Sequence, residues 1–302
     1  MENYRQYLDP KVVDKLGRLE LKARLIVEGF VQGLHRSPYH GVSVEFAEHR
    51  EYVPGDDLRH LDWKVYGKSD RFYVKRYEEE TNLECIVALD GSESMGYAGG
   101  ERMSKYRYAS MVAAALCYLV LRQRDAAGMA LFDSTLARYL APRTNTAYLG
   151  ALADALDAGL GTGKTAIGAV LGSLAERIKH RGIVVVISDL FDDPEQVLSG
   201  LRRLKGAKQD VMVFHVVDPD EVSFPFDRIS RFEGLEELPR LTVDPRALRR
   251  AYQEAFAGFE EKIRKGCRAA GVDYLRIETD QHLDVALSAY LANRAAELRR
   301  RR

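Results

Sequence analysis

The sequence has little cysteine and tryptophan, with three cysteines and one tryptophan among 302 residues. Cys85, Cys117 and Cys267 are far apart, and each lies in an apolar stretch. This scatter excludes a disulfide framework and the close ligand spacing of a zinc site. We therefore expect all three cysteines to be small residues of a buried core.

The sequence also has no excess of one charge and no long apolar run. Lysine plus arginine and aspartate plus glutamate both number 45, which argues against a general nucleic-acid-binding protein. The basic stretch Arg299–Arg302 fits the solvated end of a helix. The longest apolar run, Met111–Leu121, is too short to cross a bilayer, and the polar start Met1–Arg5 is not a secretory signal. We expect a cytoplasmic protein without a membrane span.

The apolar residues that are present suffice for a folded core. Hydrophobic residues make up 46% of the chain, so wholesale disorder is excluded. The length allows one large domain or two small ones. The chain is organised around the stretch Ile86–Met95, because this stretch combines a strand pattern with polar groups.

Ile86–Met95 has the sequence IVALDGSESM. Its apolar start is typical of a strand buried on both faces of a parallel sheet, and α/β proteins bind ligands where such strands end. Asp90, Ser92 and Ser94 offer three hard oxygen ligands in one tight loop, which suits Mg²⁺ or Mn²⁺. Because Asp-Gly-Ser is also common in ordinary turns, the short pattern does not decide alone.

Beyond this stretch, strand and helix patterns alternate. Strands are predicted over Ala127–Phe132, Leu136–Leu140, Ile183–Ile187, Val211–Val217 and Val272–Ile277. Helices are predicted over Met103–Arg124, Thr146–Ala158, Ala166–Ile178, Pro194–Leu204, Arg246–Ala270 and Leu283–Leu298. The alternation predicts an α/β domain with a doubly wound, mostly parallel sheet over residues 82–302. A polar insertion at about 219–243 is expected to contain a hairpin.

Residues 1–81 are predicted to form an N-terminal helical and β extension. Apolar residues recur at helical spacing between Pro10 and Gly33. Strand candidates follow at Gly41 and at Phe72–Tyr77, with a turn at Pro54-Gly55 between them. Asp56 is a candidate helix cap, and Trp63 is expected to anchor a core.

The segment Glu45–Glu80 carries a long motif, EFAEHREYVPGDD, then DWK from Asp62 and YVKRYEEE from Tyr73. It resembles the signature of the bacterial domain-of-unknown-function family fifty-eight, and the resemblance extends from about residue 10 to the C-terminus. Members of that family carry a von Willebrand factor A-like domain, of Rossmann type, just downstream of the motif. They are often encoded beside MoxR-type AAA+ ATPases. The resemblance therefore implies such an ATPase, or its client, as a protein partner.

The Asp-x-Ser-x-Ser pattern resembles the metal-ion-dependent adhesion site of von Willebrand A domains. That site takes Asp-x-Ser-x-Ser from one loop, a threonine from a second and an aspartate from a third. Matched residue by residue, the implied ligands are Asp90, Ser92, Ser94, Thr165 and Asp189. The family's third loop often continues with glycine, whereas Leu190 follows here, so Asp192 and Asp193 stay open as alternatives to Asp189. We expect Mg²⁺ or Mn²⁺ to bind weakly without a partner.

Two other patterns suggest different sites. Ala158–Thr165 nearly matches the P-loop pattern G-x-x-x-x-G-K-[ST], which would indicate a nucleotide-binding ATPase. A P-loop follows a buried strand, however, and the preceding Leu149–Asp157 is helical by propensity. A second candidate metal set lacks tight ligand spacing, and its charges are more simply explained as bracing a turn; it comprises His49, Asp56, Asp57, His60 and Asp62.

No nucleophile–base pair stands out, and His215, inside a predicted strand, is expected to be a core or edge residue. A bound cation alone does not make a hydrolase, because catalysis also needs an activated water and a base. We predict a non-enzymatic, metal-dependent protein-interaction module in which an acidic residue of the partner completes the cation's coordination. A chaperone-like or complex-assembly role with a MoxR-type ATPase would fit it. A purely structural scaffold is the third hypothesis, and the oligomeric state stays open.

Overall fold

The computed structural model describes residues 9–15, 18–36, 49–51, 73–75, 83–159, 165–228, 230–232 and 241–300. The chain divides into one compact unit of Met1–Arg36 with Leu83–Arg302 and a second unit of Ser37–Asn82. We expected a division into 1–81 and 82–302. The structure groups residues 1–36 with the α/β unit, whereas we expected them to belong to the extension formed by residues 1–81.

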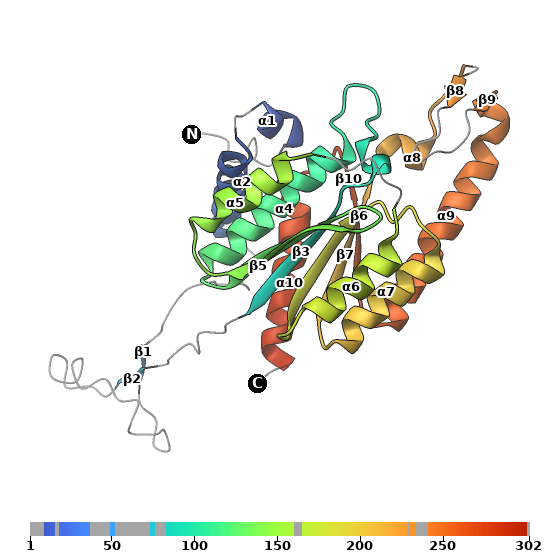
Figure 1. Ribbon diagram of the computed structural model, residues 1–302. Coiled ribbons are helices and arrows are strands. Elements are labelled where there is room, and N and C mark those ends of the chain that lie inside the picture. Colours follow the sequence, from blue (N-terminus) through green and yellow to red (C-terminus); the bar gives the residue numbers. More distant parts are fainter. Residues whose placement is uncertain are drawn as a thin grey trace. The chain divides into compact units, whose positions relative to one another are not determined.

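A six-stranded sheet forms the centre of the larger unit (Figure 1). Its strands are β3 Glu84–Asp90, β4 Ala126–Phe132, β5 Leu136–Arg143, β6 Gly182–Ser188, β7 Asp210–Val217 and β10 Asp273–Glu278. The spatial order is β10-β7-β6-β3-β4-β5, and only the edge pair β4–β5 is antiparallel. The predicted doubly wound, mostly parallel sheet is confirmed.

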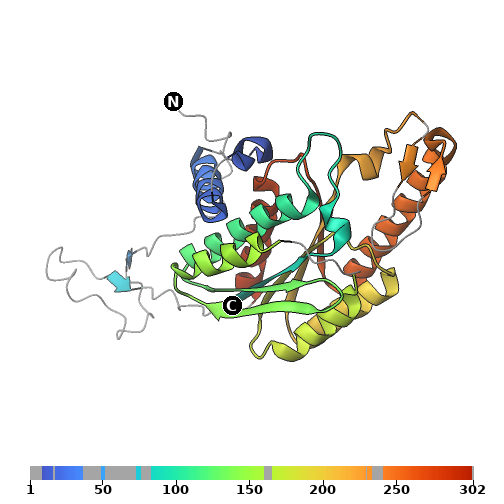
Figure 2. The same cartoon turned by 45° about the horizontal axis from the view of Figure 1, so that its top comes forward.

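Helices cover both faces of this sheet (Figure 2). The long ones are α4 Lys105–Arg122, α5 Tyr148–Asp157, α6 Ile167–Arg177, α7 Pro194–Gly206, α9 Pro245–Ala269 and α10 Asp284–Arg300. Helices α4, α5 and α10 share one core, and α6, α7 and α9 share the other. Val87 and Leu89 of β3 point into the first core, while Ile86 and Ala88 point into the second. This period of two explains why the whole strand is apolar.

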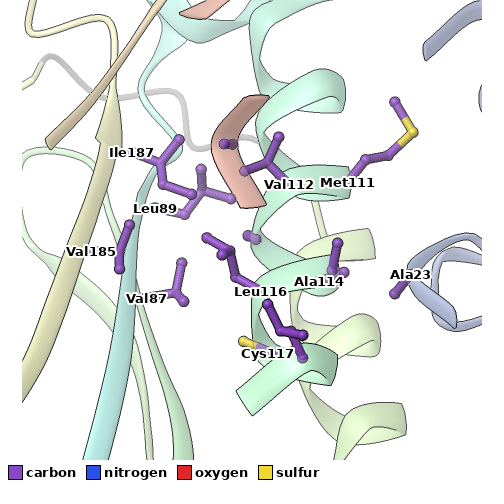
Figure 3. Close-up of a cluster of buried hydrophobic side chains, with 14 of the residues drawn as sticks. Ala23, Val87, Leu89, Met111, Val112, Ala114, Leu116, Cys117, Val185 and Ile187 are labelled. Carbon is purple, nitrogen blue, oxygen red and sulfur yellow. The ribbon is translucent and has the colours of Figure 1, made fainter. Parts of the chain in front are cut away.

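Helix α4 is buried almost all round because it lies between the sheet and a further helix. Leu116 faces the strand side chains, including Val87, whereas Ala114 lies toward Ala23 of helix α2 (Figure 3). Helix α2 spans Leu19–Arg36 and follows the short helix α1, Pro10–Asp14. The N-terminal helices therefore belong to the core of the α/β unit. None of the described helices is both long and apolar enough to span a membrane.

Helices α6 and α7 cross at two glycines. A Cβ atom built on Gly200 would lie 3.0 Å from the Cα atom of Gly168. A Cβ atom on Gly168 would lie 2.4 Å from the backbone oxygen of Gln196, closer than a real contact allows. The absence of side chains at these two positions thus lets the two helices approach closely.

The polar insertion predicted at about 219–243 contains a short helix and two paired strands. The helix, α8, spans Pro219–Ser223, and β8 Ser230–Phe232 pairs antiparallel with β9 Leu241–Val243, as expected for a hairpin. Residues 233–240 between the strands lie outside the described residues. We did not predict α8. Asp218 caps it through a reciprocal capping box with Glu221, a signal that is visible in the sequence.

The unit Ser37–Asn82 is described only at two strands, β1 His49–Glu51 and β2 Tyr73–Lys75, which pair antiparallel. Strand β2 lies within the predicted strand Phe72–Tyr77. The strand candidate at Gly41, the turn at Pro54-Gly55 and Trp63 lie outside the described residues. The side chains of the second metal set are outside them too: His49, Asp56, Asp57, His60 and Asp62.

Candidate metal centre

Strand β3 lies where the chain's connections change direction. Strand β4 follows it on one side of the sheet, and the later strand β6 pairs with its other side. In doubly wound sheets a crevice forms at the carboxyl ends of the strands at such a point. Asp90 is the last residue of β3, and Ser188, followed by Asp189, ends the adjacent β6. Two carboxylates 99 positions apart in the sequence therefore meet at one edge.

Asp90 is a buried carboxylate, with 0% of its surface exposed. Its Oδ1 atom accepts a 2.9 Å hydrogen bond from Ser92 N, and Oδ2 accepts one of 2.6 Å from Ser188 Oγ. Among the described residues, no lysine, arginine or histidine forms an ion pair with it. Burial, followed by the charge of Asp189, raises the pKa of Asp90 to about 7. A cation between the two carboxylates would relieve both effects.

Ser92, Ser94 and Asp189 continue the cluster. Ser92 Oγ lies 3.1 Å from Ser94 Oγ, and the Ser94 hydroxyl hydrogen-bonds the Asp189 carboxylate. Both serines and Asp189 are buried. Serine hydroxyls with two carboxylates form a hard oxygen donor set, as Mg²⁺ and Mn²⁺ prefer. The described residues hold no group of three histidine, cysteine, aspartate or glutamate side chains able to bind a metal, so the hydroxyls are essential to this set.

Thr165, the fourth predicted ligand, lies two residues before Ile167, the first residue of α6, at the same edge. Next to it, Ala166 N donates to the Asp133 carbonyl after β4, and Ile167 N donates to Asp192 Oδ2 at 3.0 Å. Asp193 caps α7 through Glu195 N at 3.1 Å. The two alternatives to Asp189 thus hold helix starts, whereas Asp189 lies beside Ser94 and Asp90. This favours Asp189 as the third-loop ligand, and the ligand set stays a prediction.

Leu190, the departure from the family pattern, has a left-handed backbone with φ of 56°. Glycine adopts this conformation freely, so the glycine that the resemblance to von Willebrand A domains implies at this position would fit the backbone without strain. Leu190 N donates a 2.8 Å hydrogen bond to Ser188 Oγ, the same hydroxyl that donates to Asp90. The buried Leu190 side chain packs into the second core. Ser188 therefore joins the third loop to the Asp90 carboxylate.

Lys105 is a residue of this cluster that sequence reasoning missed. Its side chain is 2% exposed, and Nζ lies 2.7 Å from Asp189 Oδ2 and 2.6 Å from Glu221 Oε1. Burial alone would raise the pKa of Asp189, but the Lys105 ammonium holds it below its usual range. Burial raises the pKa of Glu221 despite the same ammonium. No local pattern marks Lys105, because its partners lie 84 and 116 positions away in the chain.

His215 of β7 is buried beside the cluster, so of the two predicted settings, core or sheet edge, the structure has the core. Burial lowers its pKa to about 4, although Asp189, whose backbone it hydrogen-bonds, acts in the opposite sense. His215 Nδ1 also lies 2.6 Å from the Tyr274 hydroxyl of β10. A neutral imidazole thus ties the Asp189 backbone to the neighbouring strand. It is not placed as a catalytic base, because it is enclosed and has no open face toward solvent.

A hollow and an exposed aromatic side chain adjoin residues of the centre. A hollow of about 250 Å³ is lined in part by Gly91, the residue that follows Asp90. Tyr106, Phe132, Arg138 and Gly159 are among its other lining residues. Phe191, two residues after Asp189, exposes 52% of its surface, which is unusual for phenylalanine. The hollow and the exposed Phe191 side chain thus lie close in the chain to the two carboxylate residues, Asp90 and Asp189.

The P-loop alternative fails its structural test. The segment 158–165 follows helix α5 rather than a buried strand, so the strand-to-loop geometry that directs backbone amides at a phosphate is missing. Leu160–Lys164 lies outside the described residues.

Comparison with known proteins identifies the family. The family model described as "Protein of unknown function DUF58" matches residues 48–262, which is more than half of the chain. The chain belongs to this family. The membership predicted from the Glu45–Glu80 motif is therefore confirmed. Relatives of this DUF58 chain include the uncharacterized proteins Rv1480 of Mycobacterium tuberculosis and Mb1516 of Mycobacterium bovis. Each is 26% identical over 295 residues, covering 95% of this chain and 90% of theirs.

Solved structures similar to the DUF58 chain include the conserved hypothetical protein BatB from Bacteroides thetaiotaomicron. It is 17% identical with a TM-score of 0.49, covering 72% of this chain and 99% of BatB. The SpRpn10 VWA domain is 12% identical with a TM-score of 0.40, covering 68% of this chain and 93% of that domain.

Proposed function

We propose that this DUF58 chain is a non-enzymatic protein-interaction module that binds its partner through a divalent cation. Asp90, Ser92, Ser94, Thr165 and Asp189 would hold Mg²⁺ or Mn²⁺ at the carboxyl edge of the sheet. The observation that carries the proposal is the buried pair Asp90 and Asp189, linked through Ser92 and Ser94. Bound there, the cation would supply a Lewis-acidic position for an acidic side chain of the partner.

The composition of the centre supports binding rather than catalysis. Two carboxylates and three hydroxyls would supply five ligands, which leaves a position of an octahedral Mg²⁺ shell open to an outside ligand. His215, the described histidine that lies beside the cluster, is enclosed in the core and has a lowered pKa. Hydrolysis would need a general base within reach of a bound water, and His215 is not so placed.

The surface beside the centre supports a protein as the partner. Phe191 is exposed two residues from Asp189, and the hollow of about 250 Å³ is lined in part by Gly91. Aromatic side chains are enriched at the anchors of protein interfaces. The partner that the family resemblance implies is a MoxR-type AAA+ ATPase or its client, and we propose a chaperone-like or complex-assembly role with it.

Two measurements test this function. Calorimetry with Mg²⁺ and Mn²⁺ should detect binding to the wild-type chain and its loss in Asp90→Ala. Capture of the organism's own MoxR-type ATPase should fall in EDTA and in Ser92→Ala. Because coupling is reciprocal, the ATPase should also raise the cation affinity by the same factor.

The same experiments separate the rival hypotheses. An ATPase would lose nucleotide binding in Lys164→Ala and keep it in Asp90→Ala. A structural scaffold would bind partners equally in Mg²⁺, in EDTA and in Ser92→Ala. Either pattern would contradict the proposed function.

A further inference from the structure

Lys105 occupies an unusual place in the fold. It is the first residue of α4, after the Ser104 cap, where the helix dipole is positive and disfavours a cation. Its ammonium group is nevertheless buried, 5.9 Å from the centre of the Tyr97 ring and between the carboxylates of Asp189 and Glu221. Buried ion pairs contribute little net stability, because desolvation offsets the attraction. Stability alone therefore does not explain why a lysine is placed here.

The two carboxylates that bind Lys105 differ in their surroundings. Asp189 faces Ser94 and the second carboxylate, Asp90, within the candidate metal centre. Glu221 lies outside that centre, in helix α8, which is close to the loop before α4 (Figure 1). One ammonium group thus bridges a predicted metal ligand and a residue of the polar insertion.

Glu221 is held firmly in place. Its Oε2 atom accepts a 2.7 Å hydrogen bond from Asp218 N in the capping box of α8. Asp218 in turn binds Arg102 at 2.8 Å and accepts from Gly99 N at 3.1 Å. Glu221 Oε1 therefore stays available to Lys105 even when the other carboxylate changes its partner.

The charges of the cluster balance a divalent ion. Asp90, Asp189 and Glu221 carry three negative charges when ionised, and Lys105 returns one positive charge, which leaves two negative charges. A cation held by Asp90 and Asp189 would lie near the ammonium group and would be repelled by it. That repulsion falls if Lys105 keeps only its pair with Glu221.

We propose that Lys105 is a positioning residue that holds Asp189 when no cation is bound and gives it up to a divalent cation while retaining Glu221. This inference rests on the proposed metal centre and deepens it. It names the residue that pairs with Asp189 when no cation is bound, and the helix, α8, to which cation binding is coupled. Lys105 then sets a low cation affinity and links occupancy of the centre to helix α8 and the insertion after it.

The test measures Mn²⁺ binding to the full-length chain. Binding is monitored by electron paramagnetic resonance as the loss of the free-ion signal. Lys105→Met should bind Mn²⁺ about tenfold more tightly, because an opposing charge near the ligands is removed. Glu221→Gln should bind it several-fold more weakly, because Lys105 loses its second partner. Lys205→Met is the matched control, since Lys205 pairs with Asp210 at 3.6 Å, on α7 and β7, and should not change the affinity.

The double variant Lys105→Met/Glu221→Gln separates this mechanism from a general effect of charge. If Glu221 acts through Lys105, Glu221→Gln should have no effect once Lys105 is absent, whereas independent charges would give additive effects. As a second readout, Mn²⁺ should alter amide hydrogen exchange in residues 218–223 of the wild-type chain and not in Lys105→Met. Should Lys105→Met fail to fold, Lys105→Gln, whose amide can still donate to Asp189, replaces it with the same expected direction.

The outcomes distinguish this inference from the proposed function. Weaker Mn²⁺ binding in folded Lys105→Met, or additive effects in the double variant, would overturn the role of Lys105 while leaving the metal centre intact. No Mn²⁺ binding by any variant at millimolar concentration would overturn the metal centre itself and this inference with it.

Discussion

Ser188 Oγ donates a 2.6 Å hydrogen bond to Asp90 Oδ2 across the β3–β6 pair. The same hydroxyl accepts from Leu190 N, so it orients both a predicted ligand and the loop that carries Asp189. Removing a side chain that orients a metal ligand typically lowers metal affinity 10- to 100-fold. Ser188 was not a residue that we selected from the sequence, and its role leads to the first prediction.

Ser188→Ala should weaken Mg²⁺ binding by about tenfold, because Asp90 loses the donor that fixes its carboxylate. Calorimetry with Mg²⁺ on both proteins measures the change. The control is Ser173→Ala, since Ser173 is an exposed residue of α6 whose hydroxyl donates to the carbonyl of Ala169. Equal affinity in wild type and Ser188→Ala would show that this hydroxyl does not orient a ligand.

The left-handed backbone of Leu190 predicts that a glycine variant is more stable than an alanine variant at this position, the reverse of their order inside a helix. Leu190→Gly should be more stable than Leu190→Ala by about 0.5–1 kcal/mol, because both lose the same buried side chain and only alanine keeps the strained Cβ. At Leu201, buried within helix α7, glycine should instead be less stable than alanine by about 1 kcal/mol. Urea unfolding of the four variants measures both differences. The same order at both positions would contradict the assigned backbone conformation.

His215 predicts a loss of stability in mild acid. Its pKa is about 4 in the folded chain and about 6.5 when unfolded, so between these values the unfolded state binds more protons. This contribution is complete above pH 6.5 and is lost as the pH falls, by about 2 kcal/mol between pH 7 and pH 5.

The raised pKa of Asp90 acts on the free energy of unfolding with the opposite sign in the same pH range. There the folded state, rather than the unfolded state, binds the proton of this carboxyl group. The difference between wild type and His215→Gln isolates the histidine. That difference should shrink toward pH 5, as measured by urea unfolding at each pH. The exposed His282 gives the control, since His282→Gln should keep the wild-type profile. A difference that is independent of pH would refute the prediction.

The crossing of α6 and α7 predicts a fourth result. Gly168→Ala should destabilise the chain by about 1–3 kcal/mol, because the new methyl group would meet the Gln196 backbone. The control, Gly258→Ala in α9, has no atom within 4 Å of the new Cβ and should stabilise the chain by about 0.5–1 kcal/mol. Thermal unfolding measures both. Stabilisation by both substitutions would show that the helices do not cross so closely.

The sequence by itself determined the order and type of nearly all elements of the α/β unit. Strands buried on both faces are continuous apolar runs, and helices against the sheet show helical spacing, so both patterns are local. The doubly wound sheet, the family and the buried state of the three cysteines follow from such patterns and from a long motif. The predicted cytoplasmic location and the metal itself stay predictions.

Only the tertiary structure decided which polar residues meet at the centre. Lys105, Ser188 and Glu221 carry no local signal of a shared role, because their contacts join residues that are 84 to 116 positions apart in the chain. The same holds for the choice between Asp189 and its neighbours. Asp192 and Asp193 are held at helix starts, and only the fold turns Asp189 toward Asp90. A ligand set depends on how strand ends converge, and convergence is a property of the sheet rather than of any one segment.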